Sequence, residues 1–280
     1  MNSENISKLT ITEKKENILE TSPTTNKKDS YIQSANTLFN FMKEFKYLKS
    51  VLQTMEIFPR YVIEDINYMG ISSIKNIAIP MTCFCDIKLH SISHHSKYYG
   101  HYGIGLDKSI SKKINIQPII YLNDNSNLSK TYINILKNSL DLDNNKDVPD
   151  EYLNIIAEFL RSIKPLHGSM PRNGNIDIKN FHDENEWRYI PELEEKMPDM
   201  ISDEHMLTQK ALQTLNSSLL HSKIAGIKLS INLIKYLFVH RAQEKTALLK
   251  FIDEEMELSQ IDKLTLSSKI IVFEEMDGDW

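Results

Sequence analysis

Residues 77–107 read IAIPMTCFCDIKLHSISHHSKYYGHYGIGLD, and this segment organises the predicted fold. Its first part, residues 77–85, is rich in β-branched and aromatic side chains and predicts a buried strand. Asp86 is placed to cap a short helix that carries three histidines. The run YYGHYGIGL then predicts a second strand, whose glycines indicate close approach of another group to the backbone. Strand, short helix and strand, with polar aromatic residues at the rim, predict the wall of a pocket.

The composition predicts a globular domain behind a polar leader. Residues 1–30 are rich in Ser, Thr, Asn, Lys and Glu, so they cannot bury enough apolar surface to offset their ordering entropy. We expect this leader to be disordered or loosely attached. Residues 31–280 show no internal repeat and no Gly/Ser linker, and they are long enough to bury a core. We expect them to form a single domain.

Hydrophobic periodicity predicts the remaining elements of this domain. Strands are expected at residues 38–41, 117–122, 186–190, 233–239 and 270–273. Helices are expected at residues 44–55, 127–142, 149–163 and 242–255, with a short helix from Ser259. The breakers in residues 166–180 predict a loop, and residues 191–222 predict an irregular arm with some helix. We therefore expect an α/β (α+β) domain with a central mixed or antiparallel sheet flanked by helices.

Charge, cysteine content and hydropathy limit the class of protein. A formal charge of −5 and a pI near 6.0 argue against a surface that coats nucleic acid, although a local basic groove is compatible with them. The two cysteines have C-x-C spacing in a predicted strand, which suits a reducing compartment better than a disulfide. No apolar run approaches the length of a membrane span. We expect a soluble cytoplasmic protein with no membrane partner.

A zinc site is one interpretation of Cys83 and Cys85, because four histidines follow within twenty residues. Structural zinc sites usually bring two ligand pairs, and the second cysteine pair is missing here. Strand alternation places both cysteines on one face, where small buried cysteines are common. We therefore predict core cysteines and no metal site.

Two carboxylates, Glu184 and Glu186, stand at the entrance of the strand predicted at residues 186–190. Alternation along a strand would point both to the same side. Such a pair can divide its roles, with one carboxylate ionised and the other positioning a neighbouring group. The alternative is a solvated acidic turn with Arg188 as an ion-pair partner. From these residues alone, the acidic turn is the favoured interpretation.

His101 and Tyr102 stand in the aromatic run YYGHYG. They could donate hydrogen bonds and stack on a nucleotide-like ligand, or they could form a strand rim whose rings cover the core. Gly103 and Gly105 lie within a predicted strand and do not open a long helix, so they are not a Rossmann fingerprint.

Several runs of this sequence resemble the AbiGi family of abortive phage-resistance proteins. They are FPRYVIED, IPMTCFCDI, YGHYGIGLDK, PIIY, ENEWRYIPE, IKYLFVHRAQEKTALLKFI and LSSKIIVFEEMDGDW. The likeness covers residues 38–280, and its most specific pieces are CFCDI with YGIGL and the E-x-E-W-R run. That family is described as an antitoxin family, so the resemblance implies a partner toxin or a phage protein as the binding partner.

A second likeness is to ADP-ribosyltransferase-like folds, which share the order of parts: a strand with a polar residue, a helix, an aromatic pocket strand and a late E-x-E. It implies NAD as a possible cofactor. In those enzymes an early His holds the NAD ribose and a late Glu is catalytic. AbiGi relatives read L-F-H-F-T at the first strand, and here Asn40 stands at the position of the His. Asn can hydrogen-bond a ribose hydroxyl but cannot carry a proton or a positive charge.

The ADP-ribosyltransferase likeness implies a role for each candidate residue. Glu186 would be the catalytic carboxylate that stabilises positive charge on the ribose, with Glu184 as its orienting partner. The cofactor-binding set would hold ribose, nicotinamide and pyrophosphate, the last through a bidentate arginine. This set consists of Asn40, His101, Tyr102, and Arg60 or Arg188.

Two functional hypotheses follow for this chain. The first is an enzyme that binds NAD or transfers ADP-ribose, which the E-x-E run favours. The second is a non-catalytic antitoxin or sensor module that binds a partner toxin, which Asn40 favours. Convergence of Glu186, Asn40 and Tyr102 on one concave site of nucleotide size would support the first hypothesis, and positions on separate faces would exclude it.

Overall fold

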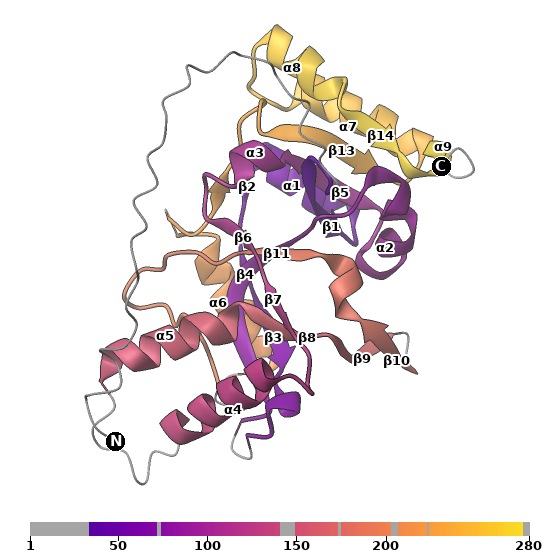
Figure 1. Cartoon of the computed structure of the whole chain (residues 1–280). Helices are drawn as coiled ribbons and strands as arrows, with labels where there is room; N and C mark the ends of the chain where they lie inside the picture. The colour runs from indigo at the N-terminus through magenta and orange to yellow at the C-terminus, as the bar shows by residue number, and fades with distance from the viewer. Residues whose placement is uncertain are drawn as a thin grey trace, which may run out of the picture. The chain divides into compact units, whose positions relative to one another are not determined.

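The long strand β4 (Asn76–Cys85) lies inside an eight-stranded mixed sheet. The strand order is β14-β13-β5-β1-β4-β11-β6, and β3 also pairs with β4. Strands β13 and β14 run parallel, and the other pairs described in this sheet are antiparallel. Figure 1 shows the computed structural model, which describes residues 34–71, 74–140, 149–172, 175–202, 207–222 and 224–276. A mixed sheet flanked by helices is the fold class expected from the sequence.

The other strands of this sheet are β1 (Thr37–Met42), β3 (Arg60–Asp65), β5 (Tyr102–Asp107), β6 (Ile116–Pro118), β11 (Glu186–Tyr189), β13 (Ile234–Val239) and β14 (Ile270–Val272). Three two-stranded sheets pair β2 (Glu56–Ile57) with β12 (Ile227–Lys228), β7 (Ile120–Leu122) with β8 (Ile163–Pro165), and β9 (His167–Arg172) with β10 (Asn175–Asn180).

The α-helices are α1 (Phe45–Thr54), α2 (Ile92–Tyr99), α3 (Lys108–Ser111), α4 (Asn127–Leu140), α5 (Asp150–Arg161), α6 (Gln209–Leu219), α7 (Ala242–Glu254), α8 (Gln260–Ser267) and α9 (Phe273–Met276). Short 3₁₀ turns are η1 (Asn67–Met69), η2 (Leu89–Ser91) and η3 (Phe181–Glu184). None of the helices in the described ranges is long and apolar enough to cross a membrane.

Strand β4 is buried on both faces, which explains its continuous apolar sequence. Ile77, Ile79 and Met81 alternate onto one face and join a core with Leu136 of α4 and Leu160 of α5. Ala78 faces the other way and packs in the cluster that contains α6 residues. The two-sided burial therefore fixes β4 between helices that lie far apart in the sequence.

Helices also cover both faces of the sheet where β1, β5 and β13 lie. Apolar side chains of α1, α7 and α8 share one core with Leu38, Ile104 and Leu237. The opposite face packs on Ile92 of α2 and Phe273 of α9. The helical stripe predicted for residues 44–55 is confirmed, because α1 buries its leucines in the first of these cores.

The glycines of β5 make room for aromatic rings of the neighbouring strand. Phe39 pairs with Gly105 and Phe41 pairs with Gly103 across β1 and β5. A Cβ atom on Gly105 would lie 3.1 Å from Cε1 of Phe39, which is tighter than ordinary van der Waals contact. The close approach predicted from these glycines is confirmed, and the approaching groups are the two phenylalanine rings together with the Thr37 methyl and the Asn40 carbonyl oxygen.

The loop predicted for residues 166–180 is wrong, because β9 and β10 form a hairpin there. Ser169 pairs with Ile178 and Gly168 with Lys179 in this antiparallel ladder. The Asn173–Gly174 pair, which lies outside the described residues, is the sequence signal for a two-residue hairpin turn. The breakers of this segment therefore fit a hairpin better than a loop.

Three further expectations need correction. Strands β4 and β5 are not neighbours, because β1 lies between them. The strand predicted at residues 117–122 is divided into β6 and β7, since Ile119 donates its N–H to the Glu186 carbonyl between them. Asp86 does not cap α2, because its carboxylate pairs with Lys108 instead.

The expected leader, residues 1–30, lies outside the described residues, and Ser34–Trp280 form one unit.

Candidate active site

A cavity of about 850 Å³ lies beside an open edge of β4. Met81 is the last β4 residue that pairs with β3, and Cys85 is the one that pairs with β1. Between them the backbone of Cys83 has no strand partner on that edge, because β11 occupies the opposite edge. The cavity is therefore positioned by the point at which β1 and β3 leave β4. Its other walls come from α2, β8, β9 and η3.

Asn40 lines this cavity from the middle of β1. Its Nδ2 donates a hydrogen bond of 2.9 Å to the carbonyl oxygen of Cys83. That bond satisfies a β4 carbonyl where the ladder is interrupted, and it fixes the orientation of the side chain. An amide suits this position because its nitrogen donates to the strand while its oxygen stays an acceptor.

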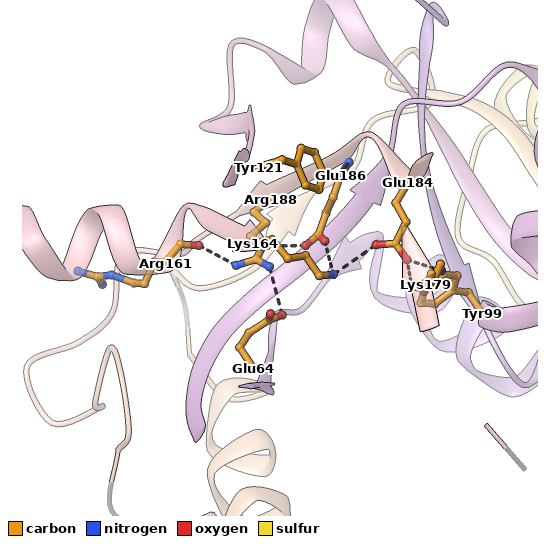
Figure 2. Close-up of polar contacts among 9 residues, drawn as sticks. All are labelled: Glu64, Tyr99, Tyr121, Arg161, Lys164, Lys179, Glu184, Glu186 and Arg188. Carbon is orange, nitrogen blue, oxygen red and sulfur yellow. Dashed lines mark hydrogen bonds and ion pairs between the residues drawn. The ribbon is translucent and has the colours of Figure 1, made fainter. Parts of the chain in front are cut away.

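Glu186 is the centre of a buried ion-pair network, shown in Figure 2. Its Oε1 accepts from Nε of Arg188 at 2.7 Å, and its Oε2 accepts from Nζ of Lys164 at 2.8 Å. Arg188 also donates to the carbonyl oxygen of Arg161 at 2.8 Å and to Oε1 of Glu64 at 3.1 Å. Strand β11 therefore carries a carboxylate whose two oxygens are both held by cations.

Glu184 joins the same network from η3. Lys164 Nζ lies 3.3 Å from its Oε2, and its Oε1 accepts from both Lys179 and Tyr99. The two glutamates converge, but strand alternation is not the cause. The solvated acidic turn is wrong, because both glutamates are buried, although Arg188 is the expected ion-pair partner of Glu186. Glu184 precedes the strand, and Asn185 turns the chain in a left-handed conformation with φ of 42°.

The charges around Glu186 determine its protonation. Burial by itself raises the pKa of Glu186, but Arg188 and Lys164 outweigh this effect and lower the pKa to about 2. Burial lowers the pKa of Lys164, but Glu186, Glu64 and Glu184 outweigh this effect and raise it. At neutral pH, Glu186 is therefore an anion beside a cation. This state suits electrostatic stabilisation of positive charge better than proton transfer.

The lowered pKa of Glu186 predicts a pH-dependent contribution to stability. A carboxyl whose pKa falls from 4.5 to about 2 on folding stabilises the protein above pH 4.5 and loses this effect as the pH falls toward 2. We expect the difference in unfolding midpoint between wild type and Glu186→Gln to be largest at pH 7 and smaller at pH 3. Urea denaturation at both pH values measures it, and an equal difference at the two would contradict the assignment.

His95 and Tyr99 form an aromatic wall on the α2 side of the cavity. Their rings stack with centroids 4.4 Å apart, and the His95 ring lies 5.4 Å from that of Phe41. Burial lowers the pKa of His95 to about 4, so the imidazole is neutral at pH 7. The wall therefore offers uncharged planar rings to a ligand.

Both cysteines line the same cavity, and both are free thiols. Burial raises the pKa of both Cys83 and Cys85 well above the usual value, which keeps the thiols protonated. No group of three or more potential metal ligands is gathered anywhere in the part of the chain that the structure describes.

Four of the predicted cofactor-binding residues do not line the cavity. Tyr102 donates to Oε1 of Glu244 at 2.6 Å, and His101 stacks on His240 beside a separate small pocket. Arg60 is exposed at the start of β3, and Arg188 is buried behind Glu186.

The cause of these misplacements is topological. Because β1 separates β5 from β4, the β5 residues lie one strand farther from the open edge than a direct β4–β5 pair would place them. Arg188 cannot reach a ligand because its guanidinium donates to two carboxylates and a carbonyl inside the protein.

Sequence reasoning missed Lys164 and the α2 side of the cavity. Lys164 is a single lysine between a predicted helix and a predicted loop, and no spacing connects it to Glu184 or Glu186. Tyr99 belongs to the run YYGHYG, but its position at the end of a short helix distinguishes it from His101 and Tyr102 only in the folded chain.

Comparison with known proteins assigns the family. A family model described as "Putative abortive phage resistance protein AbiGi, antitoxin" matches residues 55–240. This chain belongs to the AbiGi family. Another AbiGi protein, the abortive phage resistance protein AbiGi of Lactococcus lactis subsp. cremoris, is 36% identical over 250 residues, which cover 81% of this chain and all of the relative. No solved structure matches the chain.

AbiGi membership confirms the resemblance carried by CFCDI, YGIGL and the E-x-E-W-R run. The AbiGi match contains Lys164, Glu184 and Glu186, whereas Asn40 lies before its first residue. It places the protein in a family of abortive phage resistance, which agrees with the expected role in anti-phage defence.

Proposed function

We propose that this AbiGi-family protein contributes to phage defence by binding a nucleotide of the NAD class in the cavity beside β4. The observation that carries this proposal is the convergence of Asn40 with Glu184 and Glu186, from two distant parts of the chain, on one cavity. Tyr102, the third residue of the expected convergence, lies outside this cavity. Its volume of about 850 Å³ lies in the range of small-molecule sites.

Each wall of the cavity has a part in this proposal. The amide oxygen of Asn40 accepts a hydrogen bond from a ribose hydroxyl, since its nitrogen already donates to Cys83. The uncharged rings of His95 and Tyr99 lie along a planar ring of the ligand. Glu186 then faces the bond between the ribose and the nicotinamide.

ADP-ribose transfer is the reaction that such a complex would support. Cleavage of the bond between ribose C1′ and the nicotinamide nitrogen leaves the bonding electrons on neutral nicotinamide, which departs, and builds positive charge on the ribose. A nucleophile of the acceptor then forms the new bond to C1′. A carboxylate with a pKa near 2 remains ionised throughout and stabilises that charge. The elements β1, α1, β5 and β11 follow one another along the chain in the order of parts of ADP-ribosyltransferases. From this order we infer an ADP-ribosyltransferase-like arrangement.

Calorimetric titration of NAD tests this proposal. We expect wild type to bind, and Asn40→Ala and Glu186→Gln to bind about tenfold more weakly, because each loses a polar contact with the ligand. Tyr102→Phe is the matched control and should bind like wild type, since Tyr102 lies outside the cavity. Absence of heat at millimolar NAD with folded wild type would refute nucleotide binding.

A non-catalytic antitoxin that binds a partner toxin is the second candidate function. Two observations favour it: the antitoxin description of the family, and the cations that already hold Glu64, Glu184 and Glu186. Co-purification with the product of the neighbouring gene tests it. Under this candidate, wild type and Asn40→Ala retain the partner equally, whereas loss of the partner in Asn40→Ala would implicate the cavity.

A further inference from the structure

We propose that Lys164 is a built-in occupant of the anionic end of the cavity, and that a positively charged ring binds there by displacing its ammonium group. This inference rests on the proposed function, since it specifies which oxidation state of the nicotinamide ring the site selects.

The surroundings of the Lys164 ammonium are those of a site for an organic cation. Its Nζ lies 2.8 Å from Glu186 Oε2, 3.3 Å from Glu184 Oε2 and 4.5 Å from the centroid of the Phe181 ring. Two carboxylates and an aromatic face stabilise a cation by direct attraction and by the ring quadrupole. The side chain is 12% exposed, so the site is largely withdrawn from water.

Close packing keeps the Phe181 ring in this position. Gly168 of β9 lies against the ring, and a Cβ atom there would come within 2.3 Å of Phe181 Cε2. The aromatic side of the site is therefore fixed by the backbone of the hairpin.

Lys164 is the cation that the network can release. Without Lys164, Glu186 still accepts a hydrogen bond from Nε of Arg188 at 2.7 Å. Glu184 likewise still contacts Lys179 and Tyr99. Withdrawal of Lys164 therefore leaves no carboxylate without a partner. A lysine also suits release, because its ammonium is a point charge on a flexible four-carbon stem.

The charge balance identifies the ligand that fits. Among the described residues, the ion pairs of this network join three carboxylates and three cations, namely Glu64, Glu184, Glu186, Lys164, Lys179 and Arg188. When the Lys164 ammonium leaves, one negative charge is uncompensated, and a ring with a single positive charge restores the balance. The nicotinamide ring of NAD⁺ carries that charge, whereas the dihydronicotinamide ring of NADH is neutral. The site should therefore prefer NAD⁺.

Titration of Lys164→Met with NAD⁺ and NADH tests the inference. We expect the variant to bind NAD⁺ about tenfold more tightly than wild type, because the competing ammonium is absent, and to bind NADH unchanged. Lys112→Met, which removes an exposed lysine of the α3 end, is the matched control and should resemble wild type. Lys164→Gln serves as a second variant, and thermal melts establish that each is folded.

The outcomes separate this inference from the proposed function. If wild type binds NAD⁺ and neither Lys164 variant binds it more tightly, displacement of Lys164 is overturned. The proposed function is then unaffected. If no variant binds either dinucleotide, the proposed function fails. The displacement idea is then decided by the 1-methylnicotinamide cation with neutral nicotinamide as control: binding of the cation alone to Lys164→Met supports it, and no binding overturns it.

Discussion

Arg188→Met is expected to lose about 3–5 kcal/mol of the free energy of unfolding. The Arg188 side chain is 1% exposed and donates to Glu186, to Glu64 and to the carbonyl oxygen of Arg161. Methionine fills much of the same volume but leaves two carboxylates with less compensation in a buried setting. Removal of one member of a buried ion pair is costly because the remaining charge stays desolvated.

Urea denaturation at pH 7 measures this loss, with Arg60→Met as the matched control. Arg60 is exposed at the start of β3, so its replacement should change the free energy of unfolding by less than about 0.5 kcal/mol. The double variant Glu186→Gln with Arg188→Met should recover part of the loss, because it also removes the buried carboxylate charge that Arg188 compensates. Equal midpoints for wild type and Arg188→Met would contradict the network as a stabilising feature.

Gly100→Ala is expected to be similarly damaging, through the backbone and not through charge. Gly100 ends α2 with φ of 112° and ψ of 166°, a conformation open essentially to glycine alone. A Cβ atom there would lie 2.0 Å from the carbonyl oxygen of Met42, which is backbone and cannot rotate away. The backbone strain alone costs about 1–3 kcal/mol, and displacement of β1 adds to it.

Gly70→Ala is the control that separates conformational strain from the steric clash. Gly70 also has a positive φ of 61°, but the nearest atom to an added Cβ is Nζ of Lys137 at 3.2 Å, the end of a flexible side chain. We expect Gly70→Ala to cost about 1–2 kcal/mol, the penalty of the left-handed region. Thermal unfolding of both variants measures the difference, and a smaller loss for Gly100→Ala would be incompatible with its contact to Met42.

The apolar patterns of the sequence predict where the main strands lie, but they do not predict which strands pair. Strands β1, β4, β5 and β13 were located because each has a distinct run of β-branched, aromatic or glycine residues. Pairing between strands was not predictable in the same way, because nothing in residues 77–107 indicates that a strand from residues 37–42 inserts between its two halves. This single insertion moves His101 and Tyr102 away from the cavity.

The candidate site was predictable only in part for a related reason. The E-x-E spacing at a strand entrance identifies Glu184 and Glu186, whereas their roles and the choice of Asn40 come from the ADP-ribosyltransferase likeness. Lys164 lies in none of the runs that resemble the AbiGi family, and Glu64 lies in FPRYVIED, where no spacing connects it to Glu186. The roles of both residues arise from side chains that meet across β8, β3 and β11. Contacts of this kind depend on tertiary packing, which no local spacing encodes.

The location of bound NAD⁺ is the most direct test of the account. A crystal of Lys164→Met grown with NAD⁺ should show the nicotinamide ribose between Asn40 and Glu186, with the ring where the Lys164 ammonium lies in the wild-type protein. NAD⁺ bound away from this cavity, for example beside His101 and His240, would contradict it.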